Sequence, residues 1–252
     1  MSYVIALAGK GGTGKTTIAA LLVRLIKDSG LGSVLAVDAD PNSNLAESLG
    51  VEPKETIGGI LDEVATQPDK VPQGWTKDRF IEYRVQSAVQ EEEGFDIITM
   101  GKPEGPGCYC YVNNILRSVM ARLVNDYDYT VIDNEAGLEH LSRRTTRSAD
   151  TLLVISDATA VGLKAAGRIA LLVNQLGIKA NAKQLIVNRQ DKPVEKEKLG
   201  ALDLQYIGNI PLDEEVAGIS LGGLSLWDLG SASKSLRALK DLEKTILQRR
   251  RR

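Results

Sequence analysis

The sequence predicts an α/β fold, a doubly wound and mostly parallel sheet with helices on both faces, in a single domain over residues 1–252. Short β-branched runs alternate along the chain with longer segments that repeat apolar residues at helical spacing. A glycine-rich segment joins the first run directly to the first helical pattern. Strands that alternate with helices form right-handed βαβ crossovers, and ligands of such sheets bind at the carboxyl ends of the strands.

The expected strands are short runs that are mainly apolar, as in strands buried on both faces. They cover residues 3–8, 33–38, 95–100, 129–133, 151–156, 184–188 and 204–208. Helices are expected over residues 16–30, 112–126 and 161–177. The first helix ends at Gly30, a residue suited to a helix C-terminus, and one stripe of it carries Ile18, Leu22, Leu25 and Ile26.

Two segments depart from this alternation. Residues 51–94 are expected to form a helical insertion between the second and third of these strands, either a structural cap or a docking surface. The tail, residues 233–252, ends in four arginines and has an apolar stripe at helical spacing, formed by Leu236, Leu239, Leu242 and Ile246. We expect this stripe to pack the last helix on the sheet, and binding to a membrane surface is the alternative.

The charge balance excludes a global field that would favour nucleic acid or an anionic surface. The chain has 31 basic and 33 acidic residues and a formal charge of -2. The apolar run at the N-terminus is shorter than the roughly 18 residues that span a bilayer, and no basic leader precedes it. We therefore expect a cytoplasmic protein that does not bind nucleic acid, and we favour a packed tail over one that binds a membrane.

Residues 9–16, with the sequence GKGGTGKT, match the pattern G-x-x-x-x-G-K-[ST] between a strand and a helix, which is typical of a phosphate-binding loop. The glycines let backbone N–H groups surround a polyphosphate at the helix N-terminus. Lys15 is expected to reach the β and γ phosphates, and the Thr16 hydroxyl is expected to bind Mg²⁺. The expected nucleotide-binding residues of the loop are Gly11, Gly12, Thr13, Gly14, Lys15, Thr16 and Thr17.

The segment KGGTGKTT has an additional lysine, Lys10, and resembles the deviant Walker A motif of the ATPase group that includes MinD, ParA and the nitrogenase iron protein. The resemblance implies a P-loop NTPase fold of the SIMIBI type that binds ATP or ADP with Mg²⁺. It also implies that Lys10 reaches the partner's nucleotide in a homodimer that sandwiches ATP. The alternative is that Lys10 is a solvated surface charge.

Asp40, in the segment VDADPNSN, resembles the switch I aspartate that positions the attacking water in this group. Phosphoryl transfer needs one oriented water and cations around the γ-phosphate, so Lys10, Lys15 and Asp40 are the expected catalytic residues. Asp38 and Asp40 would also suit a simple turn before Pro41.

Three later motifs match the same group in the same order. Asp133, in VIDNEAG, stands in the Walker B position near Mg²⁺. Asn188 stands where the group contacts adenine, and Pro211 and Asp213 stand in a second loop on the purine side.

Cys108 and Cys110, in the segment GKPEGPGCYC, are the two cysteines of the chain. A disulfide between residues two apart would be strained, whereas two thiolates can supply half of a tetrahedral Zn²⁺ site or one edge of a planar Ni²⁺ site. A second chain would complete four thiolates across a two-fold axis. The alternative is two ordinary buried cysteines, although the surrounding glycines and prolines favour a loop.

The segment GKPEGPGCYCYVNNILR resembles the cysteine motif of CooC-type ATPases, the nickel-insertion proteins of carbon monoxide dehydrogenase and acetyl-CoA synthase maturation. The resemblance covers nearly the whole chain. It implies a homodimer that binds Ni²⁺ or Zn²⁺ at Cys108 and Cys110, with one of those two nickel enzymes as client. A positioning or partitioning switch of the MinD or ParA kind and an iron–sulfur scaffold or reductase are the alternatives.

Overall fold

The computed structural model describes residues 2–101, 118–134, 148–200 and 202–247 of the chain. Within them an eight-stranded sheet has the order β3-β4-β2-β5-β1-β6-β7-β8. Its strands are β1 (Tyr3–Gly9), β2 (Val34–Ala39), β3 (Gln90–Glu92), β4 (Phe95–Thr99), β5 (Tyr129–Asn134), β6 (Ser148–Ser156), β7 (Lys179–Asn188) and β8 (Gln205–Ile210). Every neighbouring pair is parallel except β3 with β4. The predicted fold class is confirmed.

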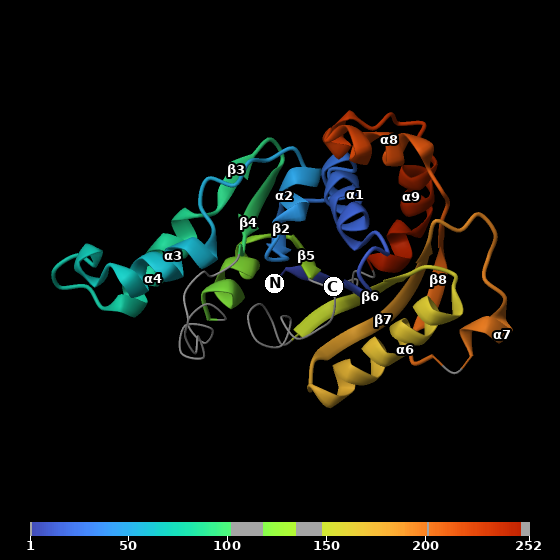
Figure 1. Ribbon diagram of the computed structural model, residues 1–252, viewed down its shortest axis with the longest axis horizontal. Helices are drawn as coiled ribbons and strands as arrows, with labels where there is room; N and C mark the ends of the chain where they lie inside the picture. The colour runs from blue at the N-terminus through green and yellow to red at the C-terminus, as the bar shows by residue number, and fades with distance from the viewer. Residues whose placement is uncertain (1, 102–117, 135–147, 201, 248–252) are drawn as a thin grey trace.

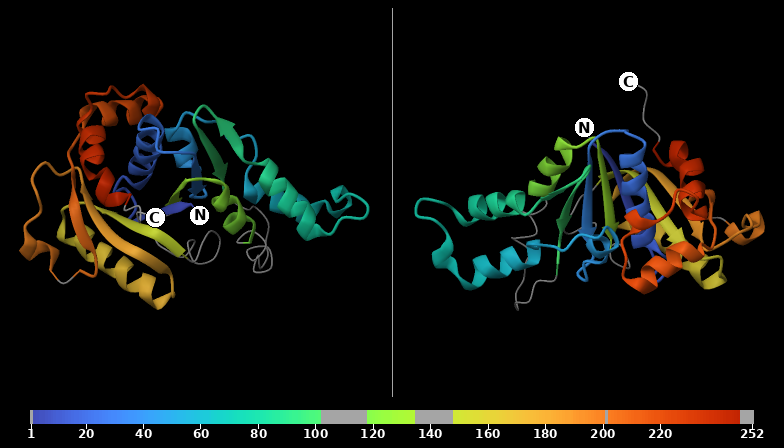
Figure 2. Two further views of the ribbon diagram at one scale, coloured as in Figure 1. Left: turned by 180° about the vertical axis from the view of Figure 1, so that it is seen from behind. Right: turned by 90° about the horizontal axis from the view of Figure 1, so that it is seen from above.

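Helices cover both faces of the sheet (Figures 1 and 2). They are α1 (Lys15–Asp28), α2 (Asn44–Ser48), α3 (Ile57–Thr66), α4 (Lys77–Ser87), α6 (Ala160–Gln175), α7 (Lys196–Leu199), α8 (Glu214–Gly222) and α9 (Lys234–Ile246), with short 3₁₀ turns at η1 (Pro68–Lys70), η2 (Val124–Asp126) and η4 (Leu226–Asp228). One apolar core lies between the sheet and α1, α2, α8 and α9. The other lies between the sheet and α3, α4, α6 and the helical residues 118–123.

Helix α1 forms where its apolar stripe predicts. Ile18, Leu22, Leu25 and Ile26 are all buried against the sheet. The helix ends at Asp28, and Gly30 follows with φ 60°, a left-handed conformation that glycine adopts at little cost. Because the helix starts at Lys15, its N-terminus opens onto the carboxyl end of β1.

The segment between β2 and β4 is helical for most of its length. Helices α3 and α4 extend from the side of the molecule that carries β3 and β4, and begin at the capping residues Thr56 and Thr76 (Figure 1). Besides these helices, the expected helical insertion over residues 51–94 contains the short strand β3, which pairs antiparallel with β4. Gly94, with φ 86°, allows the tight turn that brings the charged strand β3 to the edge of the sheet.

Helix α9 packs its apolar stripe inward. Leu239 and Ile246 are fully buried in the same core as α1, and Leu236 and Leu242 are partly buried against it. The carbonyl of Ile246 accepts hydrogen bonds from Tyr3 and Thr151, and that of Thr245 accepts one from Gln184. Among the residues described, the longest apolar helical stretch falls short of what a bilayer crossing needs.

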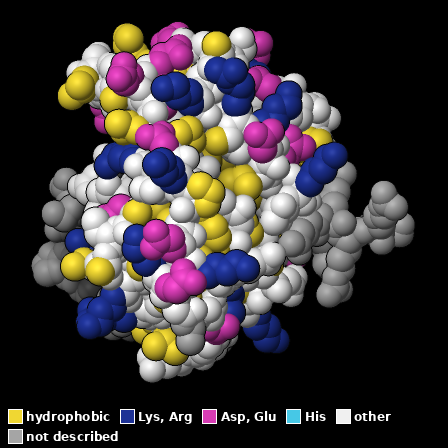
Figure 3. Space-filling view, turned by 90° about the vertical axis from the view of Figure 1, so that its right-hand side faces the viewer, with side chains coloured by type: hydrophobic (Ala, Val, Ile, Leu, Met, Phe, Trp, Pro, Cys, Tyr) yellow, Lys and Arg dark blue, Asp and Glu magenta, His cyan; other side chains and the backbone are white. Residues whose placement is uncertain are grey.

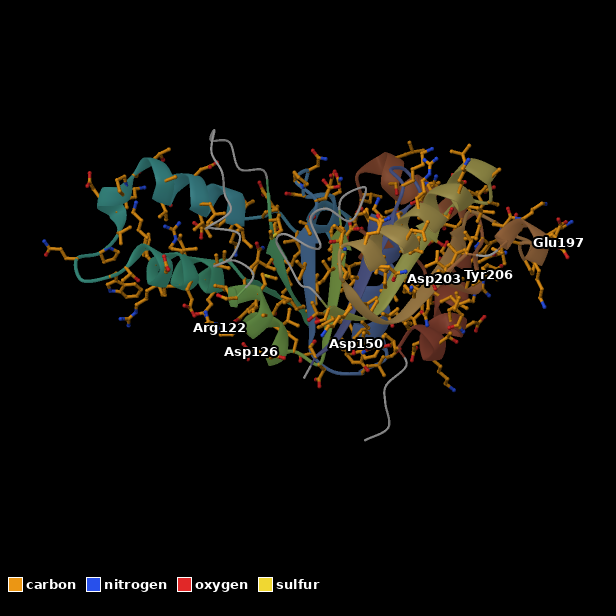
Figure 4. All side chains as sticks on the ribbon, turned by 90° about the horizontal axis from the view of Figure 1, so that it is seen from below. Arg122, Asp126, Asp150, Glu197, Asp203 and Tyr206 are labelled. Atoms are coloured by element: carbon orange, nitrogen blue, oxygen red, sulfur yellow. The ribbon has the colours of Figure 1, made fainter. Side chains whose placement is uncertain are left out.

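Polar side chains join neighbouring elements at the amino ends of the strands, where Figure 4 labels Asp150 and Asp203. Asp150 accepts hydrogen bonds from the Val4 N–H at 2.9 Å and from Asn181 Nδ2 at 3.0 Å. Asp203 forms an ion pair with Lys183 and accepts a bond from Asn174. These contacts lie at the opposite end of the sheet from the loop between β1 and α1.

Candidate functional site

The loop between β1 and α1 has a backbone that requires glycine. Gly12 and Gly14 have φ of 80° and 88°, in the left-handed region. A Cβ on Gly9 would lie 2.3 Å from the carbonyl oxygen of Ile155, and a Cβ on Gly14 would lie 2.3 Å from Asn188 Nδ2. The loop therefore packs directly on the ends of β6 and β7.

The expected phosphate-binding side chains lie in and next to this loop. Lys15, the first residue of α1, is 8% exposed, and its Nζ lies 3.5 Å from the Lys10 carbonyl. The side chain of Lys10 is exposed at the surface. The Thr13 hydroxyl donates to the Lys10 carbonyl at 2.9 Å, which closes the loop, and Thr17 lies in the first turn of α1.

Thr16 and Asp133 form the closest side-chain pair of the site. The Thr16 hydroxyl donates to Asp133 Oδ2 at 2.6 Å, although β5 and α1 are far apart in the sequence. Burial raises the pKa of Asp133 to about 6, against the lowering effects of the Thr16 bond and of the Lys15 charge. Asp133 Oδ1 is buried and has no hydrogen-bond partner among the described residues.

This donor set fits Mg²⁺. A hydroxyl and a carboxylate are the oxygen ligands that Mg²⁺ prefers, usually together with phosphate oxygens and waters. The unpaired Asp133 Oδ1 is the kind of buried polar atom that a cation or its bound water would satisfy.

The end of β2 and the loop after it hold two carboxylates in different environments. Asp38 is fully buried, and its Oδ2 accepts the N–H groups of Leu45 and Ala46 at 2.9 and 3.0 Å. Burial raises the pKa of Asp38 to about 7, and the nearby charge of Asp133 adds to this effect, while the backbone N–H groups lower it. Asp40 is partly exposed, and its Oδ1 accepts two hydrogen bonds from Asn42.

Asn188 ends β7 beside the phosphate-binding loop. Its Nδ2 donates to the Thr13 carbonyl at 2.9 Å, and the residue is 7% exposed. Because the donor end of the amide is used in this bond, the Oδ1 atom is left to accept from a ligand.

Pro211 and Asp213 follow β8, but the Asp213 side chain is occupied within the protein. Its Oδ1 accepts from the Glu215 N–H at 3.1 Å, and its Oδ2 accepts from Ser233 Oγ at 2.6 Å and the Ser235 N–H at 2.9 Å. Asp213 thus caps α8 and joins it to the start of α9. Pro211 is partly exposed at the end of the same strand.

The structure brings the loop residues 9–17, Asp133 and Asn188 together at the carboxyl edge of the sheet, with Asp40 and Pro211 at the ends of flanking strands. Cys108 and Cys110 lie outside the described residues. Within the part of the chain that is described, no cluster of three or more His, Cys, Asp or Glu residues has the arrangement of a metal site.

Sequence reasoning did not assign a function to Asp38, Asn42 or Arg189, which also belong to this edge. Asn42 holds Asp40, Asp38 holds the loop that carries Asp40, and Arg189 bonds to the Gly12 carbonyl. The sequence offers one signal for Asp38, since a charged residue at the end of a run buried on both faces needs polar partners.

Comparison with known proteins gives a consistent picture. The family model "CobQ/CobB/MinD/ParA nucleotide binding domain" matches residues 4–226. An uncharacterised ATP-binding protein of Methanocaldococcus jannaschii is 40% identical over 98% of this chain and 99% of its own length. The carbon monoxide dehydrogenase accessory protein CooC of Rhodospirillum rubrum is 30% identical over 91% of each chain.

Among solved structures, the septum site-determining protein MinD of Pyrococcus horikoshii, complexed with Mg-ADP, has a TM-score of 0.72 to this chain at 21% identity. The match covers 98% of this chain and 96% of that one. A MinD protein from Aquifex aeolicus has a TM-score of 0.70 at 20% identity, over 98% and 97% of the two chains. At these identities the likeness is one of fold.

Proposed function

Because the chain belongs to the CobQ/CobB/MinD/ParA nucleotide-binding family and is an ATPase of this group, we propose that it uses ATP to deliver nickel to a client enzyme. The proposed client is carbon monoxide dehydrogenase or acetyl-CoA synthase, and the proposed location is the cytoplasm. The single observation that carries the proposal is the Cys108-x-Cys110 pair in a chain 30% identical to a CooC protein along 91% of its length.

In the proposed ATPase site, Lys15 and the N–H groups of the loop bind the phosphates, and Lys10 extends to a nucleotide held by a second copy of the chain. Asp40 orients the attacking water once Asn42 releases it. Asn188 Oδ1 accepts from the adenine amino group, and Pro211 lies near the base. Mg²⁺, held by Thr16 and Asp133, would neutralise charge on the β and γ phosphates.

The nickel or zinc ion is cargo in this proposal. Cys108 and Cys110 of two chains would supply four thiolates, so that one ion binds per dimer. Closure of the dimer around ATP and binding of the ion would then favour each other, and by linkage each must tighten the other by the same factor.

The second candidate is an ATP-dependent positioning switch, which the likeness of fold to MinD favours. Such a switch binds DNA or a membrane in its ATP-bound form and does not need the cysteine pair. On the face in Figure 3, Lys and Arg side chains are interspersed with Asp and Glu, so this face offers no field of one sign to an anionic surface.

Anaerobic titration with Ni²⁺ and with Zn²⁺, with and without ATP, tests the proposal when the mass is followed by light scattering. We expect one ion per two chains, and loss of tight binding in Cys108→Ala and in Cys110→Ala, because each change removes two thiolates per dimer. Proton release on binding should accompany the ion, since the thiols must ionise.

One ion per chain with unchanged affinity after both cysteines are replaced would contradict the delivery function. ATP-dependent sedimentation with anionic vesicles or DNA would then support the positioning switch. Broad iron–sulfur absorption bands in the anaerobically purified protein would indicate the scaffold alternative.

A further inference from the structure

The end of β7 contacts the phosphate-binding loop through two consecutive side chains. Asn188 donates to the Thr13 carbonyl at 2.9 Å, and Arg189 donates from Nη1 to the Gly12 carbonyl at 3.3 Å. Asn188 Nδ2 also lies 2.3 Å from the position that a Cβ on Gly14 would take. Three consecutive loop residues are thus contacted by the last residue of β7 and the residue that follows it, although β6 separates β7 from β1.

The backbone of Arg189 is held in an unusual conformation. Its φ is 56°, and Ser43 in the loop after β2 is the other non-glycine residue with positive φ among those described. Such conformations cost free energy and persist where the surroundings determine them, often at functional sites. Here the next residue, Gln190, donates its N–H to the Ile210 carbonyl at 3.0 Å, which fixes the turn on the far side of Arg189.

We propose that Arg189 is a positioning residue that holds the phosphate-binding loop in its ATP-binding conformation. The loop contains glycines with positive φ, and glycine loses more conformational freedom on ordering than any other residue. In a planar trans peptide the C=O and the next N–H point in opposite directions, so a bond to the Gly12 carbonyl orients the whole peptide between Gly12 and Thr13. Asn188 does the same for the next peptide, which leaves the Gly14 N–H for a phosphate oxygen.

The proposed role predicts which kinetic constant depends on Arg189. A loop that is ordered in advance binds the phosphates in the ground state and in the transition state alike, so its loosening raises KM and leaves kcat nearly unchanged. The inference rests on the ATPase activity of the chain and is independent of the proposed delivery of nickel.

The test compares ATP with inorganic tripolyphosphate, which has the phosphates without the base or the ribose. In Arg189→Met, which removes the donor, we expect the KM for ATP and the inhibition constant of tripolyphosphate to rise together by about 3- to 10-fold, with kcat within about 2-fold of the parent. Arg189→Lys, a donor of similar reach, should restore both constants. Lys192→Met, which removes an exposed charge from the following loop, is the matched control and should change neither.

Several outcomes would overturn the inference. A rise in KM for ATP with unchanged inhibition by tripolyphosphate would mean that Arg189 acts on the base or the ribose. A large fall in kcat at constant KM would mean that it acts on the transition state. Unchanged constants in Arg189→Met, equal effects in Lys192→Met, or no recovery in Arg189→Lys would each show that the Gly12 bond does not order the loop.

Discussion

Near the ends of two strands, a buried aspartate accepts hydrogen bonds from backbone N–H groups of a following helix. The two carboxylates nevertheless differ in how readily they ionise. Asp38 is the next-to-last residue of β2 and is 0% exposed. It accepts hydrogen bonds from backbone N–H groups alone, and the charge of Asp133 lies opposite it on β5. Asp213 follows β8, is 8% exposed and also accepts the Ser233 hydroxyl.

The pKa values of the two groups shift in opposite directions. Burial raises the pKa of Asp38 to about 7, because the hydrogen bonds from its N–H partners lower the pKa by less than burial raises it. Burial also raises that of Asp213, but hydrogen bonds from Ser233, Ser235 and Glu215 outweigh it, so its pKa lies below the usual value. The comparison shows that a few hydrogen bonds and the nearest charge decide whether a buried carboxylate favours or opposes folding at neutral pH.

The largest expected effect is on ATP hydrolysis, in a variant of Asp40. This residue follows Asp38 by two positions and is partly exposed. Asp40→Ala should lower kcat by about 100-fold or more and retain ATP binding, because only the attacking water loses its position. Phosphate release at saturating ATP measures the rate, and a fluorescent ATP analogue measures binding. Asp69→Asn, on an exposed turn far along the insertion, is the matched control. Turnover at the parental rate would refute the assignment of Asp40.

The next effect is the pH dependence of stability at Asp38. Its native pKa lies above the unfolded value, so its contribution to the free energy of unfolding is greatest at low pH and is lost as pH rises from about 4 to about 7. Between pH 5 and pH 8 the free energy of unfolding of Asp38→Asn, relative to the parent, should therefore change by about 2 kcal/mol in favour of the variant. Urea unfolding at each pH measures the difference, and two parallel curves would contradict it.

A smaller effect is expected at Asp213. Asp213→Ala should lower the free energy of unfolding by about 1 to 3 kcal/mol at pH 7, since it leaves buried N–H groups without an acceptor. The contribution of the carboxylate is present above the unfolded pKa of about 4 and is lost as pH falls through the lower native pKa. Thermal unfolding measures the loss, and Ser233→Ala, which removes one of the bonds, should cost less. An unchanged melting temperature with a raised KM for ATP would instead support the role on the purine side that the motif predicts.

The fold could be predicted well from the sequence because its strands and helices have distinct periodicities. The stripe of α1 and the strands β1, β4 and β5 lie where their apolar patterns predict. The pattern predicted only the second half of β7, residues 184–188. The short strand β3 was missed because three charged or polar residues have no apolar pattern, and its pairing depends on the turn at Gly94. From the sequence, the apolar stripe of α9 was compatible both with packing on the sheet and with binding to a membrane. In the structure the stripe packs inward, where α9 contacts α1 and β8.

The candidate site could be predicted in part. Residues 9–16 and Asp133 belong to local motifs, and the structure places Thr16 and Asp133 in contact. The sequence could not show that Asn188 and Arg189 bond to the carbonyls of Thr13 and Gly12, because these contacts cross β6 and depend on a left-handed turn at a residue other than glycine.

The sequence by itself determined the alternation of the main strands and helices, the phosphate-binding loop and the presence of two cysteines, because each depends on neighbours along the chain. The tertiary structure decided which carboxylate is buried, which helix face meets the sheet and which side chains hold the loop. These depend on the strand order, which brings β5, β6 and β7 to the carboxyl end of β1. Burial and hydrogen bonding depend on which residues are close in space, whatever their separation along the chain.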